Sequence, residues 1–479
     1  MKIQRQTLLA ALVIAITACA DMSGPANHAQ LVDANQLAAA RSFQDIAVAD
    51  WPGKDWWRGF NDPQLDALID QGIAANPSLR IAEARVRKTQ SLVEGARSAL
   101  LPQVNGNLAV MQEKFSENFI YPPPFAGTWN VQSQGTIDFG YEFDFWGKNR
   151  AAVASALGTA KAAEVDSAAA RIMVSAAIMH GYVELQRAFA QRDIAETLQQ
   201  SREHLLRLTA QRTSEGLDSQ VELKLAETAI PDVRARISAI DESIALVRNQ
   251  LAALLGQGPD RGLGIARPRL DPRQIPALPA QLPAELLGRR PDIVAQRWRV
   301  EAAAKDIEVA KALFYPDISL TAFLGLQSIG LSEFVKSGSS IIGVGPALSL
   351  PFFDGGRRRG NLAGRDADYD IAVEQYNKTL VDALHEVVDQ LSSFRALAEQ
   401  QSQQRLLLAR TQDSFDLTLL RYHAGLINYL QVLAAEAQVL AQKSRTADLD
   451  ARGLDLSISL YRALGGGYDG QVKPVATQP

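Results

Sequence analysis

The sequence of 479 residues has one cysteine, five histidines and no excess of basic residues. One cysteine cannot form a disulfide bond within the chain, and no Cys/His cluster offers a structural zinc site. Lysine and arginine number 49 against 53 acidic residues, so nothing favours nucleic acid as a partner. We therefore expect no enzyme, no metal and no cofactor, although a hydrophobic content of 47% supports a large packed structure.

Motifs of nucleotide and hydrolytic chemistry are also missing. The chain contains neither GxxxxGK[ST] nor GxSxG, which argues against a nucleotide engine and an esterase. His385 and Glu386 begin a run similar to HExxH on a predicted helix, but its fifth position is Asp389. A helix-surface pair is the better interpretation.

The N-terminus has the pattern of a secretory signal. Lys2 and Arg5 precede an apolar run, Leu8–Ala18, which is too short to span a bilayer and ends directly before Cys19. This ending resembles the bacterial lipobox, which implies a diacylglycerol thioether on Cys19 and a further acyl chain on its freed amine. Several chains anchor a protein far better than one. The alternative is a stray cysteine behind a plain signal peptide.

The residues after Cys19 bear on sorting between the two membranes. An aspartate directly after the cysteine retains lipoproteins of this type at the inner membrane, but Asp21 lies one place further. We therefore expect the outer membrane. No later stretch approaches 18 consecutive apolar residues, so a crossing of the membrane requires β-structure.

The sequence is internally duplicated. Residues Asn76–Val104 align without a gap onto Arg290–Ile318, and Leu208–Gly256 align onto Leu417–Gly465. The offsets of 290 − 76 = 214 and 417 − 208 = 209 are nearly equal, as expected for two copies of one unit. Identical pairs include Pro77/Pro291, Arg212/Arg421, Gly216/Gly425 and Glu227/Glu436.

Each copy contains segments in which apolar and polar residues alternate. They cover 130–145 in the first copy, and 318–327 and 342–352 in the second. Such alternation predicts strands with one apolar face, and about 10 residues suit a transmembrane strand. Soluble hairpins with one buried face are the alternative, but aromatic residues in the connections, such as Phe119, Trp129 and Phe334, are typical of a membrane interface.

Long helices follow the strands. No proline lies between Pro124 and Pro231 or between Pro351 and Pro474, and we expect helices over 149–214 and 356–423, each about 100 Å long. An amphipathic helix precedes the strands of each copy, over 77–100 and 291–314. Glycine turns at 215–217 and 424–426 should end the long helices, with return helices after them.

The elements do not close a structure within one chain. Four membrane-type strands cannot form a barrel, and an open sheet edge cannot lie in hydrocarbon. The chain must therefore oligomerise and pool its strands and helices around a water-filled conduit.

The residues behind these expectations resemble a known family, the outer membrane factors of tripartite efflux systems (TolC-like), in its lipidated NodT-type branch. The resemblance covers nearly the whole mature chain. Its landmarks are Trp56-Trp57-Arg58-x-Phe60-x-Asp62-Pro63-x-Leu65, Tyr141-Glu142-Phe143-Asp144-Phe145-Trp146-Gly147-Lys148, Leu282-Pro283 through Arg289-Arg290-Pro291-Asp292-Ile293, and Phe353-Asp354-Gly355-Gly356-Arg357.

The resemblance implies a mainly α fold with transmembrane β-structure. It further implies a homotrimer with a 12-stranded β-barrel and a 12-helix periplasmic tunnel. The implied function is the outer-membrane exit channel of an efflux or secretion system. Its partners would be a periplasmic adaptor (membrane fusion protein), an RND-type or similar inner-membrane pump, and outer-membrane lipid.

The resemblance also implies functional residues at the two glycine turns. Gly216, Leu217, Gly425 and Leu426 fall at the tips that dock the adaptor. Channel-gate residues would be Tyr422 with Glu222 as its acidic partner, Leu430 as the pore constriction, and Gln431 where some members carry an aspartate. Ala434 occupies a second such position, so a hydrophobic constriction is favoured over a ring of carboxylates. The alternative for each residue is an ordinary packed or solvated helix position.

The predicted domain boundaries follow the duplication. They are a signal peptide (1–18), an anchor and equatorial segment (19–75), repeat 1 (76–260), a linker (261–289), repeat 2 (290–466) and a tail (467–479). Two rivals remain. A lipid-anchored periplasmic adaptor-type coiled-coil protein would carry one hairpin, and a lipid-anchored enzyme would need a convergent set of catalytic groups.

Overall fold

The computed structural model describes residues 29–33, 37, 51–272, 288–350 and 352–470. The signal segment 1–18 and Cys19 lie outside these residues, so the lipidation of Cys19 stays a prediction. The described chain forms two compact units, and each draws segments from both repeats. Unit 1 contains Arg85–Ala163 and Ala295–Asn377, whereas unit 2 contains Val32–Ala84, Glu164–Val294 and the chain from Lys378 onward.

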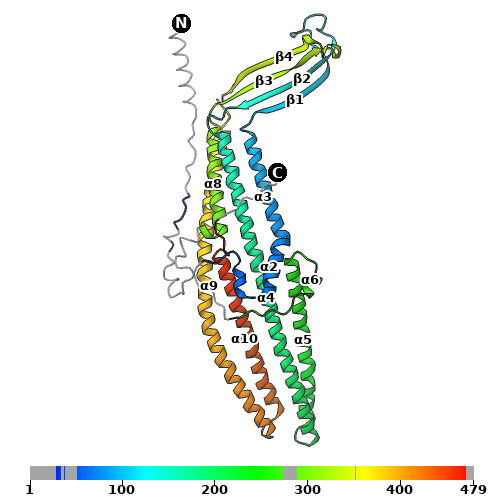
Figure 1. The fold of residues 1–479 in the computed structure, drawn as a ribbon, viewed down its shortest axis with the longest axis vertical. Helices are drawn as coiled ribbons and strands as arrows, with labels where there is room; N and C mark the ends of the chain where they lie inside the picture. Colours follow the sequence, from blue (N-terminus) through cyan, green and yellow to red (C-terminus); the bar gives the residue numbers. More distant parts are fainter. Residues whose placement is uncertain (1–28, 34–36, 38–50, 273–287, 351, 471–479) are drawn as a thin grey trace. The chain divides into compact units, whose positions relative to one another are not determined.

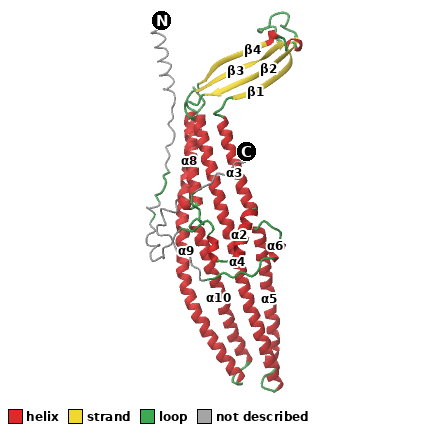
Figure 2. Cartoon of the chain, in the orientation of Figure 1, coloured by secondary structure: helices red, strands yellow, loops and turns green. Residues whose placement is uncertain are grey.

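The element order repeats itself, and helices predominate over one sheet (Figures 1 and 2). The first copy contains α3 (Pro77–Ser98), β1 (Gln103–Lys114), β2 (Trp129–Glu142), α4 (Lys148–Ser214) and α5 (Gln220–Leu254). The second contains α8 (Pro291–Ala312), β3 (Asp317–Ile329), β4 (Ser340–Ser349), α9 (Arg357–His423) and α10 (Tyr429–Ala463). Shorter elements are η2 (Trp56–Phe60), α2 (Pro63–Ala75), α6 (Asp260–Leu263), η3 (Leu331–Glu333) and η4 (Ser337–Ser339).

The lengths of the helices confirm the duplication. Both α4 and α9 have 67 residues, α5 and α10 have 35, and α3 and α8 have 22. The sequence also predicts the mainly helical class correctly. The chain has two long helical hairpins, α4/α5 and α9/α10, whereas the adaptor-type alternative requires one. The structure therefore argues against an adaptor-type protein. Pro231 lies inside α5.

Equivalent contacts tie the return helix of each repeat to its first helix. Asn76 donates to the carbonyl of Leu254 at 2.7 Å, and Arg290 donates to that of Ala463 at 2.9 Å. The glycine after each return helix has positive φ and packs against a carbonyl. A Cβ on Gly256 would lie 2.4 Å from Ala75 O, and one on Gly465 would lie 2.1 Å from Arg289 O. Glycine is therefore required at both positions.

Unit 1 contains an antiparallel sheet in the order β1-β2-β3-β4, so β1 and β4 are its edge strands (Figure 1). The register aligns Ile137 with Leu324 and Leu324 with Ile342, and all three side chains are exposed. The opposite face is polar near Asp138, which accepts from Asn107 at 2.6 Å and from Thr136 at 2.9 Å. The predicted alternation of apolar and polar faces is thus confirmed.

The helical part of unit 1 holds its helices close together through small residues. A Cβ on Gly158 of α4 would come within 3.1 Å of Ala302 of α8, so glycine permits close contact at this position. One turn along α4, the ammonium of Lys161 lies 4.0 Å from the ring centroid of Trp298. This cation–π contact covers the exposed edge of the same interface.

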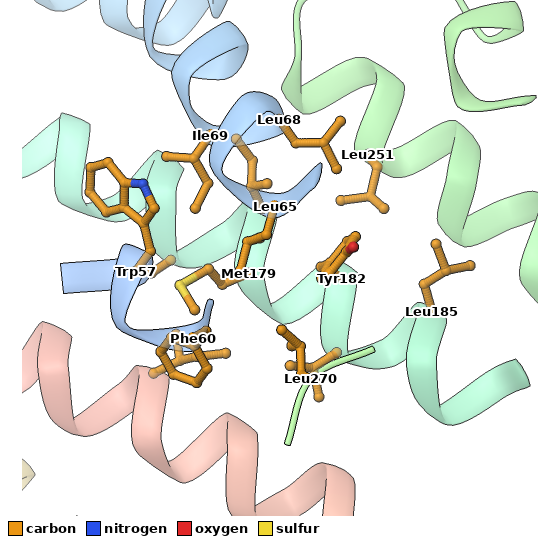
Figure 3. Packing of buried hydrophobic residues seen from close by; sticks show 14 of the residues in the cluster. Trp57, Phe60, Leu65, Leu68, Ile69, Met179, Tyr182, Leu185, Leu251 and Leu270 are labelled. Carbon is orange, nitrogen blue, oxygen red and sulfur yellow. The ribbon is translucent and has the colours of Figure 1, made fainter. Parts of the chain in front are cut away.

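Unit 2 is organised around an aromatic and aliphatic core. Trp57, Phe60 and α2 pack against Tyr182 and its neighbours on α4 and against Leu251 of α5 (Figure 3). The buried hydroxyl of Tyr182 donates to Asp62 at 2.8 Å and accepts from Gln64 at 2.7 Å. Asp62 also caps α2, so the Trp-Trp-Arg-x-Phe-x-Asp-Pro landmark serves a structural role.

Within the described residues, no helix combines the length and the apolar composition needed to cross a membrane.

Candidate functional site at the helical tips

The connection from α4 to α5, residues 215–219, is here termed the first tip (Figure 1). The amide of Gly216 donates to the carbonyl of Thr213 at 3.1 Å, and that of Leu217 donates to Arg212 at 2.8 Å. Gly216 has φ of +77° and open space around its Cβ position, so its backbone conformation is the reason for glycine. These two bonds form a Schellman motif.

The second tip, residues 424–428, joins α9 to α10 in the same way. Gly425 has φ of +74° and donates to the carbonyl of Tyr422 at 3.0 Å, and Leu426 donates to that of Arg421 at 3.0 Å. In a Schellman motif the residue after the glycine often packs back on its helix. Here Leu217 is 63% exposed and Leu426 is 69% exposed. Each tip therefore presents one unpacked leucine.

Glu222 begins α5 as part of a capping box. Ser219 accepts from the amide of Val221 at 3.1 Å, and the carboxylate of Glu222 accepts from the amide of Ser219 at 2.9 Å. Hydrogen bonds from Ser219 lower the pKa of Glu222. The carboxylate predicted to meet Tyr422 is thus engaged at the start of its own helix.

Tyr422 instead reaches Asp218 across the two hairpins. Its fully buried hydroxyl donates to Asp218 Oδ2 at 2.8 Å and lies 3.1 Å from Thr209 Oγ1. Arg212 pairs with the same carboxylate at 2.9 and 3.2 Å, donates to the carbonyl of Tyr422 at 3.1 Å, and lies 4.5 Å from the centroid of its ring. The two tips are therefore joined by one polar cluster, formed by Thr209, Arg212, Asp218 and Tyr422.

The cluster keeps Asp218 ionised. Burial acts to raise the pKa of this carboxyl, but the hydrogen bonds from Arg212 and Tyr422 and the charge of Arg212 outweigh burial and hold the pKa below 3.8. Only 5% of the Asp218 side chain and 10% of the Arg212 side chain are exposed. Removal of one partner from a buried pair costs about 3–5 kcal/mol, because the other charge stays buried without compensation.

Beneath the polar cluster lies an apolar layer formed by both hairpins. Leu205 of α4, Ala226 of α5, and Tyr429 and Val432 of α10 are buried together with Tyr422. The rings of Tyr422 and Tyr429 have centroids 6.0 Å apart. Burial raises the pKa of Tyr429 to about 12, and its hydroxyl has no hydrogen-bond partner among the described residues.

Leu430 and Gln431 lie on the side of α10 that faces away from this layer. Leu430 is 57% exposed, and Gln431 and Ala434 are also exposed.

The site residues predicted from the sequence include Tyr422, which lies in this cluster, but not Arg212, Thr209 or Asp218. A comparison of the repeats contains the signal. At an offset of 209, Tyr422 corresponds to Thr213 and Asp218 to Ile427. The site therefore combines two positions at which the copies differ, Asp218 and Tyr422, with two that both copies keep, Thr209 and Arg212.

The described residues contain no group of three or more His, Cys, Asp or Glu side chains that could hold a metal ion.

Comparisons with known proteins agree with this architecture. A family model described as "Outer membrane efflux protein" matches residues 68–257 and 282–466. The chain is 40% identical over 361 residues to the fusaric acid resistance protein FusA of Burkholderia cepacia, covering 74% of this chain and 68% of that protein. It is 31% identical over 468 residues to the multidrug resistance outer membrane protein MdtP of Escherichia coli K12, covering 96% and 95%.

Solved structures show the same fold. The outer membrane protein VceC of Vibrio cholerae matches with a TM-score of 0.80 at 38% identity, over 87% of this chain and 100% of that chain. The outer-membrane channel OprN matches with a TM-score of 0.81 at 26% identity, over 95% and 100%.

Proposed function

Because the chain belongs to the outer membrane efflux protein family, we propose that its two helical tips form the gate of the exit channel and the docking surface for a periplasmic partner. The chain is an outer membrane efflux channel that extends into the periplasm. The observation that carries the proposed gate is the hydrogen bond of Tyr422 to Asp218, because it fastens one hairpin to the other.

The open sheet supports a homotrimer. Strands β1 and β4 are edge strands, and an exposed edge in hydrocarbon would leave backbone groups without partners. Three copies would supply 3 × 4 = 12 strands and close the sheet. The aliphatic face that includes Ile342, 80% exposed in one chain, would contact lipid, and the polar face would line the conduit. Acyl chains on Cys19 would add an anchor.

The exposed leucines of the tips support docking of an adaptor. Each tip has an exposed leucine directly after its glycine, Leu217 after Gly216 and Leu426 after Gly425. Three chains would therefore present six exposed leucine side chains on equivalent turns. An adaptor of the membrane fusion type would bind them and connect the channel to an inner-membrane pump, of the RND type or similar. The names of FusA and MdtP refer to fusaric acid and multidrug resistance, which suggests that small toxic organic compounds are exported.

The exposed side of α10 supports a constriction. Leu430 would narrow the pore from three chains, and Gln431 would line it without a charge. Glu222 would contribute indirectly, because its capping box fixes where α5 begins beside Asp218.

Conductance in planar bilayers tests the proposal. The purified wild-type protein should conduct rarely, and Asp218→Ala should conduct more often because it breaks the polar cluster. A folded, membrane-inserted Asp218→Ala protein that stays silent would contradict the gated duct. As a matched control, Asp260→Ala removes an exposed acid from the start of α6 and should behave as wild type.

A further inference from the structure

A second ion pair lies deeper between the hairpins, and neither the fold nor the polar cluster accounts for it. Nε of Arg202 on α4 lies 3.3 Å from Oε2 of Glu436 on α10. Glu436 is only 5% exposed, and 12% of the Arg202 side chain is exposed. Arg202 also donates to the carbonyl of Ala229 at 3.3 Å and lies 3.6 Å from the exposed carboxylate of Asp232.

The pair is poorly compensated for its burial. Both carboxylate oxygens of Glu436 and Nε of Arg202 are buried without a well-aligned hydrogen bond among the described residues. Burial raises the pKa of Glu436, and the opposing effects of Ser201 and Arg202 do not outweigh it. Removing charges from water is expensive, and a buried pair with few added hydrogen bonds contributes little net stability. An apolar pair of similar volume would serve folding at least as well. The two charges are therefore better explained by a role in positioning α10 against α4 than by a contribution to the free energy of unfolding.

The duplication shows that a helical hairpin does not need this pair. At the offset of 209, Glu436 corresponds to Glu227 and Arg202 to Thr411. Glu227 is 43% exposed and pairs with Lys224 on its own helix at 2.7 Å. Thr411 donates to the carbonyl of Leu407 within α9. The ion pair thus exists on one side of the repeat only, where α4 faces α10.

We propose that Arg202 and Glu436 form a second latch of the gate, which holds α10 against α4 when the channel is closed. This inference rests on the proposed gate and extends it inward. Arg202 lies ten residues before Arg212, which is about 15 Å along α4. The apolar layer of Leu205, Tyr429 and Val432 lies between the two latches.

The two latches constrain different parts of the second hairpin. The polar cluster holds the end of α9 through Tyr422, whereas Glu436 holds α10 two turns beyond its start. Release of the polar cluster alone would free the second tip while α10 stays attached to α4. Complete opening requires both latches to separate, because Leu430 lies on α10 between them.

Single and double substitutions test the second latch. Glu436→Gln leaves the guanidinium of Arg202 with only the exposed carboxylate of Asp232, so the open probability in planar bilayers should rise roughly tenfold. Arg202→Met should also raise it. The double variant Arg202→Met/Glu436→Leu should return to the wild-type closed state, because the interface becomes apolar on both sides. A purely structural role predicts instead that the single variants lose helical content or outer-membrane protein with no rise in open probability.

Matched controls separate this inference from the proposed gate. Glu227→Gln changes the equivalent residue of the other repeat and should leave the open probability unchanged. Helical content and the amount of protein in the outer membrane should match wild type for every variant. If Asp218→Ala opens the channel and Glu436→Gln does not, the second latch is refuted while the gate stands. If neither variant conducts more often than wild type, both the proposed gate and the second latch are refuted.

Discussion

Tyr422 donates a hydrogen bond to Asp218, and this single contact joins the last turn of α9 to the turn that precedes α5. Because Arg212 neutralises the carboxylate and Thr209 contacts the hydroxyl, the contact is buried and fully partnered. A gate built in this way should respond to the loss of one hydrogen bond.

Tyr422→Phe should favour the open channel. Loss of the hydroxyl leaves Asp218 with one donor fewer and costs about 1–3 kcal/mol of the closed state, because a buried acceptor loses its partner. Single-channel recording should show more frequent openings. The control is Tyr429→Phe, which removes a buried hydroxyl that has no hydrogen-bond partner among the described residues. Equal effects of the two variants would contradict the role of the Tyr422 hydroxyl.

Acid should loosen the tips. The pKa of Asp218 is held below its ordinary value of 3.8 in the closed state, despite the opposing effect of burial. A carboxylate with a lowered pKa stabilises the closed state above pH ~4, and this contribution is lost as the pH falls through the lowered value. Open probability should therefore be flat from pH 7 to about pH 4.5 and rise below that range. Asp218→Asn should be open throughout and lack this rise.

Leu430→Ala should widen the constriction without changing stability. Leu430 is exposed in the single chain, and exposed substitutions usually alter the free energy of unfolding by no more than about 0.5 kcal/mol. Cells with this variant should admit more of an antibiotic that is too large for the intact outer membrane. Val221→Ala is the control, because Val221 is exposed at the equivalent position of the first repeat. Unchanged susceptibility would remove Leu430 from the gate.

Polar substitutions of both tip leucines should uncouple the channel from its adaptor. Leu217→Asn/Leu426→Asn removes the two unpacked apolar side chains and leaves the glycine turns intact. Cross-linking to the adaptor in cells should fall, while conductance of the purified channel stays as in wild type. The control is Leu263→Asn, which removes an equally exposed leucine from α6. Retained cross-linking in the double variant would place the docking surface elsewhere.

A charge on the aliphatic face of the sheet should impair membrane insertion. Ile342→Lys places an ammonium on the face proposed to contact lipid, at a cost of about 2–4 kcal/mol near the membrane midplane. Less of this variant should reach the outer membrane in fractionated cells. Gln327→Lys, on the polar face, should insert normally. Equal loss of both variants would argue that the two faces do not differ in their surroundings.

Much of the fold is predictable from the sequence, because the periodic patterns of helices and strands and the prolines and glycines at their ends depend on residues close together in the chain. Proline limits α3 and α8, glycine ends α4 and α9, and the copies confirm each other at nearly constant offsets. Alternation locates β2, β3 and β4, but no alternating segment is predicted from the sequence at β1. In β1 the apolar Val104, Leu108 and Val110 do alternate with Asn105 and Asn107, but Met111 on the polar face weakens the contrast.

The acidic partner of Tyr422 could not be predicted in the same way. Glu222 and Asp218 both lie near the first tip, and the choice depends on the path of four backbone residues. The Schellman motif turns Asp218 back toward Arg212, and the capping box engages Glu222 with Ser219. The geometry of the turn and the charge of Arg212, six residues before Asp218, therefore decide which carboxylate meets Tyr422. The spacing of residues in the sequence does not show this.

The matched lengths of the helices restrict how this protein can change. Helices α4 and α9 have the same length, and so do α5 and α10. Shortening only the first hairpin would therefore move Asp218 away from Tyr422 and Arg202 away from Glu436. Insertions and deletions are therefore tolerable only when all four helices change by the same whole number of turns. A library of paired truncations should show survivors at steps of about seven residues, which correspond to two helical turns.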